Sequence, residues 1–92
     1  MITPENIVRH ELIGLTVKIV GGSNPKNTGI TGRVVDETRN MLTIEKPDGK
    51  EAKLAKEDNT FSFHVGSAWI RVDGKLLVGR PEDRIKKKFR KW

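Results

Sequence analysis

GITGRVVDETRNMLTI, residues 29–44, contains two runs of alternating apolar and polar side chains with a polar segment between them. In the first run Ile30 and Val34 share one face, with Gly32 between them on that face. Period-two patterning on both sides of a turn-rich segment predicts a β-hairpin. The glycines beside and within the first run predict a bend or bulge, as at a corner of a small barrel.

Outside this hairpin, short apolar or alternating runs predict further strands at 15–19, 52–54, 60–65, 69–72 and 75–78. The segment 47–50, PDGK, predicts a tight turn, and Asp73-Gly74 predicts a two-residue hairpin between the last two runs. Six or seven short strands without room for crossover helices indicate an antiparallel barrel or sandwich. A barrel is favoured because closure removes exposed strand edges. We therefore predict a mainly all-β fold, a small antiparallel β-barrel of about six strands.

Short helices are predicted at both ends of the chain. Thr3-Pro4-Glu5 supplies an N-cap, a proline at the first helical position and an acid in the first turn. Ile7, Val8 and Leu12 form a short apolar face on this helix, which is too short to be stable alone. The face packs either on the chain's own barrel or on a second subunit, and the sequence favours neither.

The C-terminal helix is expected to begin at Arg80. Ile85, Phe89 and Trp92 fall at i, i+4 and i+7 and form one apolar stripe, with basic residues over the rest of the surface. Residues 80–92 contain seven Lys or Arg against two Asp or Glu, so they carry +5 of the net charge of +6. A nearly neutral body with a basic end indicates a folded domain that presents cations to a polyanion.

Composition excludes several classes of function. The 92 residues form one domain, 1–92, without an apolar run long enough to span a membrane, and a cytoplasmic location is expected. The chain has no cysteine and only two histidines, which do not make a zinc site. The acidic pairs at 36–37 and 57–58 suit turns, and no nucleophile and base are suitably spaced. We predict no catalytic residue, metal site or bound cofactor in this chain.

Two segments together resemble the archaeal ribonuclease P protein component 1 family. They are LIGLTVKIVGGSNPKNTGITGRVVDETRNMLTI, residues 12–44, and VDGKLLVGRPEDRIKK, residues 72–87. The resemblance implies an Sm-like β-barrel that is a noncatalytic subunit of the ribonucleoprotein endonuclease removing the 5′ leader from precursor tRNA. It implies that the RNA performs the cleavage with Mg²⁺ that the RNA holds, while the protein stabilises the specificity region of the RNA. It also implies a zinc-ribbon protein partner, bound by the N-terminal segment (Ile7, Val8 and Leu12) and a barrel edge.

The residues favour one mode of RNA binding. The chain has no tyrosine, and its three Phe and two Trp are few enough for the core and the terminal helix to absorb. Base stacking is therefore not expected. We instead expect contacts to the phosphates and 2′-hydroxyl groups of the RNA. The candidates for these contacts are Lys18, Lys26, Arg33, Arg80, Arg84, Lys86, Lys87 and Lys88. For Lys18 and Arg33, a solvated charge without a binding role is an equal alternative.

Two other functions compete with this interpretation. Residues 17–35 loosely follow the strand, glycine loop and strand pattern of KOW-type ribosomal or transcription proteins, although the ending RPEDRIKK does not. An SH3-like protein-interaction barrel would need an aromatic groove for extended peptides, which is hard to build without tyrosine.

Overall fold

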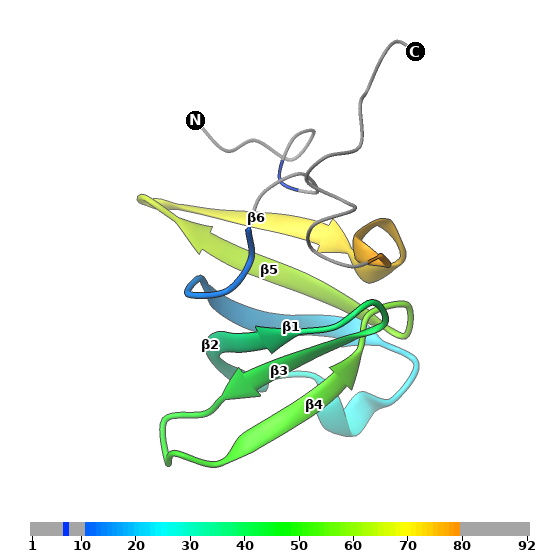
Figure 1. The fold of residues 1–92 in the computed structure, drawn as a ribbon, viewed down its shortest axis with the longest axis horizontal. Coiled ribbons are helices and arrows are strands. Elements are labelled where there is room, and N and C mark those ends of the chain that lie inside the picture. The colour runs from blue at the N-terminus through cyan, green and yellow to red at the C-terminus, as the bar shows by residue number, and fades with distance from the viewer. Residues whose placement is uncertain (1–6, 8–10, 80–92) are drawn as a thin grey trace, which may run out of the picture.

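The computed structural model describes residue 7 and residues 11–79 (Figure 1). The elements in chain order are β1 (Thr16–Gly22), the 3-10 helix η2 (Pro25–Asn27), β2 (Thr31–Glu37), β3 (Met41–Glu45), β4 (Glu51–Ala55), β5 (Asn59–Val65), β6 (Ala68–Asp73) and the 3-10 helix η3 (Gly74–Leu77). The helices predicted from Thr3 and from Arg80 lie outside the described residues, apart from Ile7, Leu12 and their described neighbours. No helix within the described ranges is long and apolar enough to cross a membrane.

All six strands belong to one antiparallel sheet with the order β4-β3-β2-β1-β5-β6. Strand β1 pairs with both β2 and β5, so it joins the two halves of the curved sheet (Figure 1). Strands β4 and β6 form its edges. The mainly β fold of six antiparallel strands predicted from the alternating runs is confirmed.

The inner face of the sheet encloses a single hydrophobic core. Every strand contributes at least one buried aliphatic or aromatic side chain to it. Phe61 and Phe63, two residues apart on β5, point to the same side, and their ring centroids lie 6.0 Å apart. Alternation therefore sorts the side chains of β1, β5 and β6 into an apolar inner face and a polar outer face.

The central hairpin forms as predicted, and Gly32 lets its two strands approach closely. A Cβ atom on Gly32 would lie 2.2 Å from the carbonyl oxygen of Glu45. Only glycine permits this close approach of β2 to β3. The register of the strand pairing shifts at two other places. One shift lies between Val34 and Asp36 in the β2–β3 pairing, and the other between Ile19 and Gly21 in the β1–β5 pairing.

The turn predicted at 47–50 is confirmed. The amide of Gly49 donates to the carbonyl of Lys46, and Gly49 has a φ of 86°. Glycine supplies the positive φ that this turn needs.

The prediction of a hairpin at Asp73-Gly74 and a strand at 75–78 is wrong. The side chain of Asp73 accepts a hydrogen bond from the amide of Lys75 and starts η3. A Cβ atom on Gly74 would lie 1.7 Å from the carbonyl oxygen of Lys56, so glycine is present for tight packing. The hairpin between β5 and β6 instead turns at residues 66–67, where Val65 pairs with Ala68.

Candidate nucleic-acid interface

The outer face of β1, β5 and β6 carries two short rows of side chains. Across the ladder, Thr16 pairs with His64, and His64 pairs with Trp69. In the next row Lys18 pairs with Ser62, and Ser62 pairs with Arg71. We call this surface the Trp69 face; it consists of Thr16, Lys18, Ser62, His64, Trp69 and Arg71.

Two cations lie on the Trp69 face, one on each side of Ser62. Lys18 and Arg71 are exposed and separated by two strand spacings, about 10 Å. Neither has an ion-pair partner among the residues that the structure describes. Their charges are therefore available to an anionic ligand.

Trp69 differs from its expected placement. The tryptophan is 51% exposed and is not absorbed by the core. Its ring contacts His64 on the neighbouring strand, with centroids 4.7 Å apart and planes inclined at 37°. Base stacking was not expected because the core and the terminal helix could bury all the aromatic side chains. For Trp69 this expectation is wrong.

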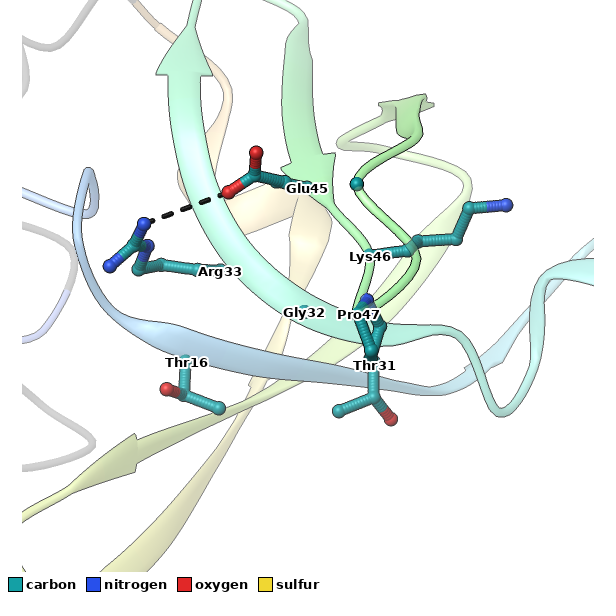
Figure 2. A pocket seen from close by; sticks show the side chains of 8 residues that line it. Thr16, Thr31, Gly32, Arg33, Glu45, Lys46 and Pro47 are labelled. Carbon is teal, nitrogen blue, oxygen red and sulfur yellow. Dashed lines mark ion pairs between the residues drawn. The ribbon is translucent and has the colours of Figure 1, made fainter.

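Arg33 on β2 pairs with Thr16, so it adjoins the Trp69 face, and it lines a shallow pocket of about 530 Å³. Figure 2 shows Arg33 and Glu45 facing one another, while Lys46 extends away on the other side of Gly32. The ion pair between Arg33 Nη2 and Glu45 Oε1 is 3.6 Å long, and both side chains are substantially exposed. An exposed pair of this length contributes little to stability, so Arg33 can exchange the carboxylate for a phosphate at small cost.

Lys26 lies in η2, in the loop that joins β1 to β2. The side chain of Asn24 accepts a hydrogen bond from the Lys26 amide and fixes the start of this short helix. Lys26 is exposed, and its role in RNA binding stays a prediction. The other five predicted RNA-binding residues, Arg80, Arg84, Lys86, Lys87 and Lys88, lie outside the described residues.

Ile7 and Leu12 are both fully buried and belong to the chain's own core. Of the two alternatives left open for the N-terminal face, packing on the chain's own sheet therefore applies to these two side chains. Val8, the third predicted partner-binding residue, lies outside the described residues.

A buried cation fixes the point where the C-terminal segment leaves the fold. Lys56 has no exposed surface, and its Nζ atom donates to Glu37 Oε2 at 2.7 Å, to the Gly79 carbonyl at 2.9 Å and to the Arg39 carbonyl at 3.2 Å. The Gly79 amide donates to the same Arg39 carbonyl at 2.7 Å. The chain is thus anchored immediately before its basic segment.

Within residues 7 and 11–79, no group of three or more His, Cys, Asp or Glu side chains could hold a metal ion. The Trp69 face itself offers two cations, hydroxyl groups and one exposed aromatic pair. These are ligands for a polyanion.

Comparison with known proteins decides the family. The family model of Ribonuclease P/MRP, subunit p29, matches residues 5–87. The chain belongs to this family.

Relatives in the family are similar over nearly their whole length. Ribonuclease P protein component 1 of Methanocaldococcus jannaschii is 56% identical, over 98% of this chain and 95% of the relative. The protein of the same name from Methanothermobacter thermautotrophicus is 54% identical, over 99% of both chains. A solved structure, that of Mth11, a homologue of human RNase P protein Rpp29, is 49% identical and superposes with a TM-score of 0.59, over 84% of this chain and all of the other. The resemblance noted in the two sequence segments is confirmed.

The p29 family match includes almost all the candidate residues. Of the predicted RNA-binding positions, only Lys88 falls beyond the matched range. Sequence reasoning missed Arg71 and the exposed Trp69. Both could have been found from the alternation along β6, which places residues 69 and 71 on the face opposite Ile70 and Val72.

Proposed function

We propose that this chain is the noncatalytic RNA-binding subunit of an archaeal ribonuclease P, which removes the 5′ leader from precursor tRNA. The observation that carries the proposal is the family match over residues 5–87, together with full-length relatives named Ribonuclease P protein component 1. The match includes the RPED segment, which a KOW-type pattern leaves unexplained.

Cations distributed over the sheet and the C-terminal segment bind the ribonuclease P RNA in this proposal. Lys18, Lys26 and Arg33 are exposed, and segment 80–92, with seven Lys or Arg against two acids, adds a net charge of +5. Contacts of this kind to phosphates hold a folded RNA without reading its sequence. The protein stabilises the specificity region of the RNA, and the Mg²⁺ needed for cleavage is held by the RNA.

The proposal includes a zinc-ribbon protein subunit as a second partner, and a cytoplasmic location in keeping with the archaeal relatives. Leu12 is buried, whereas its neighbour Ile13 is 42% exposed. Ile13 therefore offers the apolar surface that a protein partner needs near the N-terminal segment.

The proposal is tested by titrating the protein with ribonuclease P RNA and, separately, with an unrelated RNA of equal length and similar folding. We expect tighter binding to the ribonuclease P RNA, and no cleavage of precursor tRNA by the protein alone in Mg²⁺. Equal affinity for both RNAs, or correct 5′ cleavage by RNA-free protein, would overturn it.

A further inference from the structure

We propose that Trp69 is a stacking platform for an unpaired base of the bound RNA, and that Lys18 and Arg71 contact the phosphates beside that base. The proposal rests on the RNA-binding function proposed above and names the kind of RNA structure that the Trp69 face takes. It rests on the exposure of Trp69, its contact with His64, and the placement of the two cations.

Trp69 is not part of the hydrophobic core. It lies on the outer side of edge strand β6, between the inward-facing Ile70 and the exposed Ala68 at the hairpin turn. Half of its surface is open. A tryptophan at such a position leaves a large apolar surface in water, which a planar ligand would cover.

The indole ring of Trp69 is held in place by its neighbour His64. The register places His64 directly across from Trp69, and the ring centroids are 4.7 Å apart. Cross-strand aromatic pairs of this kind stabilise one arrangement of both side chains. A pre-positioned ring loses less conformational entropy when a base stacks on it than a freely rotating one would.

The charges beside Trp69 identify an anionic ligand. Lys18 and Arg71 occupy the row next to His64 and Trp69, and their cationic groups have no acidic partner in the described part of the chain. Asp73, the next outward residue on β6, uses a carboxylate oxygen to cap η3. An aromatic ring beside two free cations matches a nucleotide, which has a π-face and an adjacent phosphate.

These features favour an unpaired segment over a duplex. In a duplex the base faces are stacked on one another, whereas unpaired bases in loops and bulges expose a face to an aromatic side chain. Because every base has such a face, the platform is expected to tolerate sequence changes in the RNA.

The test compares variants at Trp69 with a matched control. Trp69→Ala should weaken binding to ribonuclease P RNA by roughly 5- to 150-fold, the range found for base–aromatic stacking, while Trp69→Phe should retain most of the affinity. Leu76→Ala is the control, because Leu76 is 63% exposed but lies in η3, away from the Trp69 face. His64→Ala should have a smaller effect than Trp69→Ala, since it loosens the ring without removing it. Melting temperatures of the free proteins show that each variant is folded.

Fluorescence gives a second readout that does not depend on the ribonuclease P RNA. The chain has two tryptophans, so Trp92→Phe leaves Trp69 as the single emitter. Titration with a short unpaired RNA oligonucleotide should quench this emission, and a blunt RNA duplex at the same phosphate concentration should quench it much less.

The outcomes separate this inference from the proposed function. Wild-type affinity in Trp69→Ala together with unquenched fluorescence would overturn the platform and leave the ribonuclease P assignment intact. Quenching by unpaired RNA without preference for ribonuclease P RNA would support the platform and contradict the assignment. If Trp69→Ala weakens binding to a protein partner while the affinity for RNA is unchanged, the Trp69 face binds protein. This outcome would also overturn the inference.

Discussion

Lys56 Nζ and Glu37 Oε2 lie 2.7 Å apart, and neither side chain has any exposed surface. Two charges removed from water in this way require close geometry and further hydrogen bonds, which the carbonyl groups of Arg39 and Gly79 supply to the ammonium. Lys56, which follows β4, is therefore bonded both to Glu37 at the end of β2 and to Gly79, two residues beyond η3.

Lys56→Met should lower the free energy of unfolding by about 3–5 kcal/mol, because it removes the buried ammonium that the Glu37 carboxylate contacts. The double variant Lys56→Met with Glu37→Leu should lose less than the single variant, since no charge remains buried. Urea unfolding of the two single variants and the double variant measures the coupling. Additive losses would show that the two side chains do not depend on each other.

Gly32→Ala should destabilise the fold by about 1–3 kcal/mol, the usual cost of an added methyl group in a tightly packed place. Its Cβ atom would meet the Glu45 carbonyl at 2.2 Å. Gly21→Ala is the matched control, because its nearest neighbour there, Thr60 Cβ, is 3.8 Å away. Thermal melting should therefore separate the two variants, and equal melting temperatures would contradict the close approach of β2 to β3.

Ile7→Ala should cost about 2–5 kcal/mol of stability, as expected when a fully buried aliphatic side chain is truncated. Ile13→Ala, which changes the same residue type at a 42% exposed position, should change stability by less than about 1 kcal/mol. Denaturant unfolding of both variants measures the difference. A small loss for Ile7→Ala would indicate that the N-terminal segment is not part of the core.

The double variant Lys18→Gln with Arg71→Gln should flatten the slope of log affinity for RNA against log salt by up to about 1.8, because each lost phosphate contact contributes roughly 0.7–0.9. The control is Lys50→Gln with Lys53→Gln, which removes the same charge from the turn before β4 and from β4 itself, at the opposite edge of the sheet. RNA titrations at several salt concentrations provide the slopes. Equal flattening by both double variants would mean that attraction is spread over the whole surface.

A chain with Lys86→Gln, Lys87→Gln and Lys88→Gln should flatten the same slope by up to about 2.7, since these residues lie in the segment that carries most of the net charge. The melting temperature should change little, because exposed charges contribute little to stability. A wild-type slope in this variant would exclude these three lysines from the phosphate contacts.

Local sequence patterns were sufficient to predict most of the strands. Alternation at Ile30–Val34 and at residues 60–65, and the PDGK turn, depend on neighbouring residues along the chain, so the sequence displays them directly. Asp73-Gly74 misled because the same dipeptide suits a hairpin and a capped 3-10 turn. What decides between them is the packing of Gly74 on the Lys56 carbonyl, a contact between segments 18 residues apart in the chain.

The site was predictable only in part. Exposure of Lys18, Lys26 and Arg33 follows from their positions on strands and in a loop. The Trp69 face is harder to anticipate, because the rows across β1, β5 and β6 exist only once the register is known. Lys56 shows the same limit, since a lysine in a charged segment resembles a surface residue until Glu37 is found beside it.

The anchoring of Gly79 has a consequence for avidity. Because Gly79 is bonded to Arg39 and Lys56, the basic residues that follow it start from a fixed point on the sheet. If the sheet binds RNA as proposed, these residues would act as a second, tethered site whose effective concentration is set by a very short tether. Releasing Gly79 would thus weaken RNA binding without removing a single positive charge that contacts the RNA.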